Sequence, residues 1–279
     1  MRSAEAPAGD DSAPEIRHYW AGGALAPTLG NEPQRILGEA PGPYTAARVE
    51  HGRARWLEAH CARLTEDSLA LGLPPPAPEA IREGFETLAR AVFGDGPGIV
   101  RMATGEKPSG ESLLVAEARA LGPGGAAWRA AIAPFPHPGP GRHPGAKLSH
   151  VSEFEQARAL CLESALDEVL LFDNRGRLVE GARSSLIVID GEGRARTPSR
   201  ALGGVKSIAL AKIYARQPLA LLADPDLRRP DLDAAREIIA VNAVRGARAI
   251  TRLDGRAVGT GRAGEGARIL ERSLAEAGA

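Results

Sequence analysis

Apolar and polar positions follow two different periods along the first 120 residues. Tyr44 to Val49 has the short period and composition of a strand. Apolar residues then recur at intervals of three and four from Leu57 to Leu71, which predicts an amphipathic helix that ends at Gly72 and the Pro-rich segment 74–78. A second helix and two more strands follow, at Ile81 to Val92, 98–103 and 112–118. These elements predict a compact α+β unit.

The second half of the chain begins after a stretch that is unable to form regular structure. Residues 134–145 are mostly Pro and Gly, a composition typical of a linker between domains. Beyond it we predict helices around 154–165, 205–216 and 267–274, and strands at 169–172, 177–180, 185–190 and 238–241. The chain is therefore divided into a loose tail, a small N-terminal domain, a linker and a larger C-terminal domain, at 1–15, 16–122, 123–146 and 147–279.

Composition narrows the class of protein. The 279 residues are 43% hydrophobic and 25% charged, as in globular proteins, and with 4% aromatic residues the core must consist of Ala, Leu, Val and Ile. The 35 basic and 35 acidic side chains balance, which argues against a nucleic-acid-binding surface. No apolar run reaches the roughly 18–20 residues of a membrane span and no signal pattern is present, so we expect a cytoplasmic protein. Cys61 and Cys161 have apolar neighbours and no metal-ligand spacing, and we expect buried, reduced thiols.

Candidates for amine chemistry are few, because only four of the basic residues are lysines: Lys107, Lys147, Lys206 and Lys212. Lys147 follows the Pro/Gly-rich stretch, so its amine is either a solvated surface charge or a partly desolvated group that forms a Schiff base. Glu180 ends a predicted strand and is either an edge charge or a carboxylate directed into the same cleft. Residues 203–205, Gly-Gly-Val, either offer N–H groups to a phosphate or allow close backbone packing.

These candidates occur in the order of a known family's motifs. From Thr45 to the end, the chain resembles the class IV (fold type IV) pyridoxal-phosphate enzymes, which include branched-chain and D-amino-acid aminotransferases and 4-amino-4-deoxychorismate lyase. The matching segments are Thr45 to Val49, His60 to Leu64, Lys147, Asp167 to Leu171, Asp173 to Leu186, Thr197-Pro198, Leu202 to Val205 and Glu237 to Ala243. The resemblance implies a two-domain fold of α+β or α/β class and pyridoxal 5′-phosphate as the cofactor.

The resemblance also implies roles for single residues. Lys147 is similar to the lysine that holds the cofactor as a Schiff base and moves protons during catalysis. Glu180 resembles the carboxylate that keeps the pyridine nitrogen protonated, and Arg63 resembles the arginine that binds the phosphate. Further cofactor-binding positions correspond to segments that supply phosphate donors in the family: Gly204, Val205, Lys206, Asn242 and Ala243.

Two segments favour a lyase over an aminotransferase. Tyr44 to Val49 resembles the aromatic-Thr-Thr-Ala-Arg-Val segment of aminodeoxychorismate lyases, and Val241-Asn242-Ala243 resembles their Cys-Asn-Ala. We therefore expect conversion of 4-amino-4-deoxychorismate to 4-aminobenzoate and pyruvate, with three substrate-binding residues: Thr45, Arg48 and Arg101. The alternatives are a class IV aminotransferase and a degenerate member without catalysis.

The segment after the lysine departs from the family. Many members have Asn-Tyr there, whereas this chain has Leu148-Ser149-His150, so the side chains around the cofactor ring differ. His150 is either an acid–base group or a hydrogen-bonded spacer. The resemblance further implies a homodimer that acts on a small molecule, and we expect no nucleic-acid, membrane or metal partner.

Overall fold

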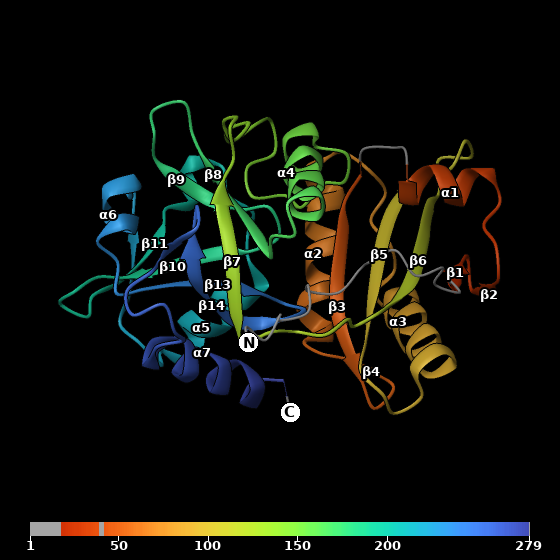
Figure 1. Ribbon diagram of the computed structural model, residues 1–279. Coiled ribbons are helices and arrows are strands. Elements are labelled where there is room, and N and C mark those ends of the chain that lie inside the picture. The colour runs from red at the N-terminus through yellow and green to blue at the C-terminus, as the bar shows by residue number, and fades with distance from the viewer. Residues whose placement is uncertain (1–17, 39–41, 279) are drawn as a thin grey trace.

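The computed structural model describes residues 18–38 and 42–278, so the predicted tail at 1–15 lies outside the described residues. The chain forms two domains that lie side by side, the small one on the right and the large one on the left of Figure 1. Helix α2 (Leu57–Ala70) and strand β3 (Tyr44–Glu50) of the small domain lie next to the large domain in this view. These two elements bring the small domain's residues to the candidate site.

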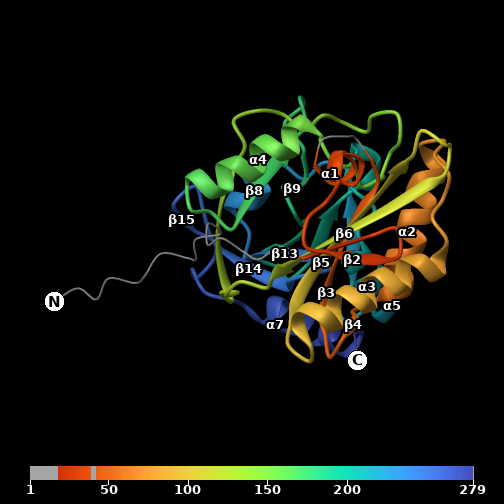
Figure 2. The ribbon, with the colours of Figure 1, turned by 90° about the vertical axis from the view of Figure 1, so that its right-hand side faces the viewer.

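The small domain is a six-stranded antiparallel sheet in the order β2-β1-β6-β5-β3-β4. Its other strands are β1 (Tyr19–Ala21), β2 (Ala24–Ala26), β4 (Arg53–Ala54), β5 (Gly98–Glu106) and β6 (Ser112–Ala120). Helices α2 and α3 (Pro78–Phe93) cover one face, as Figure 2 shows, and α1 (Asn31–Gly38) packs on the other. The predicted α+β unit is therefore confirmed.

Successive side chains of β3 point to opposite faces of the sheet, and this decides which of them contact the helices. Ala47 and Val49 are buried in the core shared with α2 and α3, and Thr45 lies on the same side of the strand. Tyr44 faces the other way and packs against the cluster that includes Ile36 of α1. This second face of the small sheet is the one that contacts Lys147.

The large domain is a mixed sheet of nine strands. The order is β12-β11-β10-β13-β14-β7-β8-β9, and β15 pairs with β14. These strands are β7 (Ala127–Ile132), β8 (Glu168–Phe172), β9 (Leu178–Gly181), β10 (Ser185–Ile189), β11 (Ala195–Pro198), β12 (Leu221–Asp224), β13 (Glu237–Asn242), β14 (Gly246–Leu253) and β15 (Arg256–Ala257). The helices are α4 (Ser152–Glu163), the 3-10 turn η1 (Arg200–Leu202), α5 (Ile208–Arg216), α6 (Arg229–Asp233) and α7 (Glu265–Glu276). Ala, Leu, Val and Ile dominate the cores on both faces of the sheet, as predicted.

The predicted linker at 123–146 is wrong in part. Residues 127–132 form β7, which pairs in parallel with β14 and β8 inside the large sheet. Trp128 and Ala130 are buried in the core of that domain. The six residues of β7 lie between Gly- and Pro-rich segments, so the composition of the region as a whole indicated a linker. The strands that pair with β7 in parallel are far away in the sequence.

The predicted helix at 205–216 begins three residues later than expected. Ser207 is its N-cap, and the Ser207 hydroxyl accepts a hydrogen bond from the Leu210 N–H at 3.2 Å. Residues 203–206 therefore precede the helix as a separate segment. Among the described residues, no helix is both long and apolar enough to cross a membrane.

Candidate active site

Backbone hydrogen bonds hold Lys147 against the small domain. Its N–H donates to the Asp67 carboxylate of α2 at 3.0 Å, and its carbonyl accepts from the N–H of Tyr44 at 3.0 Å. Pro43 and Leu148 form an antiparallel bridge beside these bonds. The Lys147 main chain is therefore fixed on both sides, which restricts where its amine can reach.

Asp67 is a site residue that the sequence reasoning missed. It lies one helical turn after Arg63 on α2 and is 8% exposed. Burial raises the pKa of the Asp67 carboxyl, against the opposing effects of the Lys147 N–H and the Arg63 charge. The spacing of four residues from Arg63 was the available signal, because such residues share one face of a helix.

The Tyr44 ring joins the predicted catalytic lysine to a predicted substrate arginine. The Lys147 amine and the Arg101 guanidinium each lie 4.8 Å from the centre of this ring. Burial alone would raise the pKa of the Tyr44 hydroxyl, but the positive charges around it, Lys147 first among them, lower the pKa below its usual value. An amine, a phenol and a guanidinium are thus gathered at one place.

Arg101 is held in this arrangement by groups of the small domain. Its guanidinium donates to the Leu37 carbonyl at 2.8 Å and lies 3.4 Å from the Glu117 carboxylate. Its side chain is 16% exposed, and the buried Glu117 is also paired with Arg119. Arg101 is therefore oriented before any ligand binds.

Glu180, at the end of β9, is buried with its carboxylate in a fixed position. The N–H of Val205 donates to both carboxylate oxygens at 3.2 Å, and the Nε2 atom of His137 lies 3.2 Å from Oε1. The Glu180 side chain is 7% exposed. Of the two alternatives that the sequence left open for Glu180, the structure excludes a solvated edge charge. His137 was not singled out, because it lies in the Pro/Gly-rich segment, which has no period to indicate a buried face.

The glycine segment 203–206 connects Glu180 with Arg63. The Arg63 guanidinium donates to the carbonyl of Lys206, and burial lowers the pKa of this guanidinium. Gly203 has φ +107°, and a Cβ atom there would lie 2.5 Å from the carbonyl carbon of Gly139. The close backbone packing considered for this segment is therefore what the structure contains.

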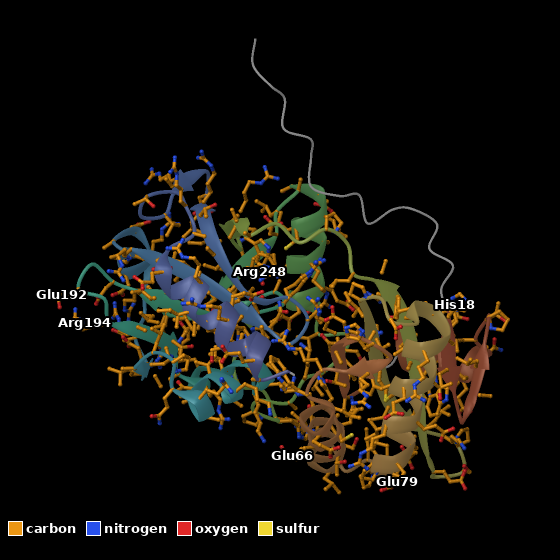
Figure 3. The ribbon with its side chains drawn as sticks, turned by 90° about the horizontal axis from the view of Figure 1, so that it is seen from below. His18, Glu66, Glu79, Glu192, Arg194 and Arg248 are labelled. Atoms are coloured by element: carbon orange, nitrogen blue, oxygen red, sulfur yellow. The ribbon has the colours of Figure 1, made fainter. Side chains whose placement is uncertain are left out.

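Val205 and Lys206, the predicted phosphate-binding residues of this segment, have protein partners in this structure. The Val205 N–H donates to Glu180, and the Lys206 N–H donates to the Gly145 carbonyl at 2.8 Å. The Lys206 amine pairs with Glu66 at 2.5 Å, both side chains being more than half exposed, and Figure 3 shows Glu66 at the edge of α2. Arg63 also has a protein partner, the Lys206 carbonyl, so the phosphate contacts of Arg63, Val205 and Lys206 all stay predictions.

Asn242 closes the turn between β13 and β14. Its side-chain oxygen accepts from the N–H groups of Val244 and Arg245 at 3.0 and 2.7 Å, and its amide donates to the Ser184 hydroxyl at 3.0 Å. The Ser184 carbonyl in turn accepts from Gly181, the residue after Glu180. Asn242 and Ala243 thus shape the backbone behind Glu180, while phosphate contacts from this turn, and from Gly204, stay predictions.

Two of the predicted substrate-binding residues lie elsewhere. Thr45 is 1% exposed and its hydroxyl lies 2.6 Å from Nδ1 of His60, on the face of β3 opposite to Tyr44. This corrects the prediction for Thr45, since adjacent residues of a strand point to opposite faces. Arg48 lies on the same face of β3 as Tyr44 but four residues further along the strand, where it pairs with Glu50 at 3.2 Å.

The buried His60 predicts a pH dependence of stability. It is 1% exposed, and burial, aided by the charge of Arg63, lowers its pKa from 6.5 to about 3. The unfolded chain takes up this proton near pH 6.5 and the folded protein does not, so stability falls as the pH falls from 6.5 towards 3. We expect His60 alone to lower the free energy of unfolding by about 2 kcal/mol between pH 7 and pH 5, measured by urea denaturation.

The variant His60→Gln, which keeps a polar partner for Thr45, provides the comparison. Between pH 7 and pH 5 the free energy of unfolding of His60→Gln should fall by about 2 kcal/mol less than that of the wild-type protein. If the free energy of unfolding falls equally with pH in both proteins, His60 is not a neutral, buried imidazole in the folded state.

The remaining candidates are structural. His150 pairs with Glu155 at 3.0 Å near the start of α4, which fits the hydrogen-bonded spacer of the two alternatives. Cys61 and Cys161 are buried free thiols, as predicted. Burial raises the pKa of both and brings that of Cys161 to about 12, so neither is a thiolate at neutral pH.

The donor set of the site matches the chemistry of pyridoxal phosphate. Lys147 supplies an amine for the aldehyde, Glu180 a buried carboxylate for the ring nitrogen, and Arg63 a guanidinium for the phosphate. Hydrogen bonds and one electrostatic interaction connect them. The Lys147 N–H donates to Asp67, and Asp67 interacts electrostatically with Arg63 on α2. Arg63 donates to the carbonyl in segment 205–206, and the N–H of Val205 in that segment donates to Glu180.

Comparison with known proteins supports the same conclusion. The family model for amino-transferase class IV matches residues 42–253, about three quarters of the chain. The chain belongs to the class IV aminotransferase family. This membership confirms the predicted family, its two-domain fold and an enzyme that uses pyridoxal phosphate.

Solved structures of the class IV aminotransferase fold resemble the whole chain. A candidate branched-chain amino acid aminotransferase from Thermotoga maritima has a TM-score of 0.80 at 16% identity, covering 94% of this chain and 96% of that one. A hypothetical aminotransferase from Mycobacterium tuberculosis in its PLP-bound form has 0.79 at 19%, covering 94% and 98%. A candidate 4-amino-4-deoxychorismate lyase from Legionella pneumophila has 0.76 at 16%, covering 90% and 96%. At these identities the likeness shows the fold, and no curated protein sequence matches the chain.

Proposed function

We propose that this class IV enzyme is an aminodeoxychorismate lyase, which converts 4-amino-4-deoxychorismate to 4-aminobenzoate and pyruvate. The observation that supports it most is the shared contact of the Lys147 amine and the Arg101 guanidinium with the Tyr44 ring. A substrate that carries both an amine and carboxylates would place a carboxylate at Arg101 and the amine-bearing carbon near Lys147. The Asn-Ala turn at 242–243, which resembles that of the lyases, favours this substrate class.

Each residue of the site has a defined task in this reaction. When bound, pyridoxal phosphate supplies an electron-accepting ring that stabilises negative charge on the carbon bearing the amine. Lys147 removes the proton from that carbon and serves as the acid and base afterwards. Glu180 would accept a hydrogen bond from the ring N–H and keep that nitrogen protonated, and Arg63 would bind the phosphate. Tyr44 and Arg101 would orient the substrate beside the Lys147 amine.

A class IV aminotransferase is the second candidate, because aminotransferases are prominent among the similar structures. The two reactions differ in what accumulates. The purified enzyme with 4-amino-4-deoxychorismate should release 4-aminobenzoate, followed by fluorescence, and pyruvate, followed with lactate dehydrogenase, in equal amounts. Amino-group exchange between a branched-chain or D-amino acid and a 2-oxo acid, without this release, would support the aminotransferase instead.

Arg101 and Arg48 form a matched pair for testing the substrate site. Both are arginines on the same face of the small sheet, but only Arg101 contacts Tyr44. Arg101→Lys keeps the charge and loses the planar fork, so we expect KM to rise about tenfold or more. Arg48→Lys should leave KM within about twofold, since its partner is the exposed Glu50. Equal effects of the two substitutions on KM would contradict this placement of the substrate.

Arg63 is predicted to determine cofactor affinity. Replacing it with Ala removes the guanidinium that lies against segment 205–206, and we expect the dissociation constant of pyridoxal phosphate to rise about 10- to 100-fold. Fluorescence titration of the apoenzyme measures this constant. Arg82→Ala, which removes an arginine paired with Glu58 on the outer side of α2, is the control and should leave the constant unchanged.

The family resemblance leads us to propose a homodimer. Light scattering of the purified protein tests this, with twice the chain mass of 29.2 kDa as the expected result.

A further inference from the structure

His137 is a buried histidine that the proposed reaction does not use directly. It is 3% exposed and lies in segment 134–145, between β7 and α4. Its backbone N–H donates to the Phe172 carbonyl at the end of β8 at 2.7 Å, and its imidazole packs in a T-shaped arrangement with the Phe154 ring of α4, at a centroid distance of 5.4 Å. Contacts from two elements of the large domain thus fix the position of the ring.

The hydrogen bonds of the two ring nitrogens settle which one carries the proton. The N–H of Gly139 donates to Nδ1 at 2.9 Å, so Nδ1 is an acceptor. The proton of the imidazole is therefore on Nε2, which lies 3.2 Å from Oε1 of Glu180 and donates to it. The sharp turn that returns Gly139 to the ring has φ +83° at this glycine, a conformation that other residues rarely adopt.

The two oxygens of Glu180 are not used equally. Within residues 18–38 and 42–278, Oε1 accepts from His137 and from Val205, whereas Oε2 accepts only from Val205, in a bond shared with Oε1. A carboxylate oxygen has two lone pairs, so Oε2 keeps room for one more donor. Arg63 of the small domain also interacts electrostatically with Glu180.

We propose that His137 is a positioning residue for Glu180: its Nε2–H fixes Oε1 so that Oε2 is presented to the ring nitrogen of the cofactor. With Oε1 occupied by His137, Oε2 is the oxygen left to accept a hydrogen bond from the ring N–H. This inference rests on the proposed function only in that Glu180 binds the cofactor ring; it does not depend on which reaction follows.

The test compares two cofactors and three variants without any turnover. In His137→Gln the amide nitrogen replaces Nε2 as a donor, and in His137→Leu and His137→Asn no donor reaches Glu180. The dissociation constant of each apoprotein is measured for pyridoxal phosphate and for its 1-deaza analogue, in which a carbon replaces the ring nitrogen. Thermal unfolding of the apoproteins reports separately on folding.

We expect His137→Leu and His137→Asn to weaken binding of pyridoxal phosphate about 10- to 100-fold, and His137→Gln to weaken it less than about threefold. Binding of the deaza analogue should be nearly equal in all four proteins, because it offers Glu180 no donor. An equal loss for both cofactors, or no loss in His137→Asn, would overturn the inference. If His137→Leu does not fold, the inference is tested by comparing the dissociation constants of pyridoxal phosphate for His137→Asn and His137→Gln. A wild-type protein that binds pyridoxal phosphate but releases no 4-aminobenzoate would contradict the proposed lyase alone.

Discussion

Lys147→Ala should abolish turnover and the visible absorption band of the bound cofactor together. The amine of Lys147 lies over the Tyr44 ring, which also contacts Arg101, and no other lysine contacts this ring among the described residues. Loss of both the covalent attachment and the acid–base group should lower kcat by at least about 10³-fold. The measurement is the steady-state rate beside the absorption spectrum of the purified variant with added pyridoxal phosphate.

The chain offers matched controls for this substitution. Lys107 pairs with Glu111 on the surface of the small domain, and Lys212 lies on α5. Lys107→Ala and Lys212→Ala should retain both the spectrum and the rate. A visible band that persists in Lys147→Ala and disappears in either control would assign the cofactor to another lysine.

Glu180→Gln should have the second-largest effect. The amide keeps the size of the side chain and loses the negative charge that stabilises a protonated ring nitrogen. We expect kcat to fall about 10²–10³-fold at saturating cofactor, the size of effect found when one preorganised electrostatic group is removed. Rates at saturating pyridoxal phosphate, together with the cofactor dissociation constant, separate this effect from weaker binding.

A second buried glutamate serves as the control for Glu180. Glu168 of β8 is fully buried, and burial raises its pKa to about 7. Because the carboxyl of Glu168 is already partly protonated near neutral pH, Glu168→Gln should change kcat by less than about threefold. If Glu180→Gln and Glu168→Gln reduce kcat to the same extent, the loss follows from replacing any buried carboxylate of the large sheet. That result would contradict a contact between Glu180 and the cofactor.

The order of the motifs was enough to predict the family, which the family model confirms. The roles of Lys147, Glu180 and Arg63 come from the resemblance to the family, and their contacts in the structure are compatible with these predicted roles. The amphipathic helices and short strands were predicted because each has a period that one buried face imposes.

What the sequence did not indicate depends on contacts between distant segments. Thr45 shares a motif with Arg48, but the alternation of β3 turns its hydroxyl toward His60. His137 lies in an aperiodic segment, and its burial follows from the approach of Gly139 to Gly203 across 64 positions of the chain. No local pattern contains that information.

Reductive trapping tests the central claim most directly. The holoenzyme is treated with sodium borohydride, which reduces the bond between cofactor and lysine, and the digested protein is mapped by mass spectrometry. The structure predicts the phosphopyridoxyl group on the peptide that contains Lys147. Recovery of that group on Lys107, Lys206 or Lys212, with Lys147 unmodified, would contradict the site described here.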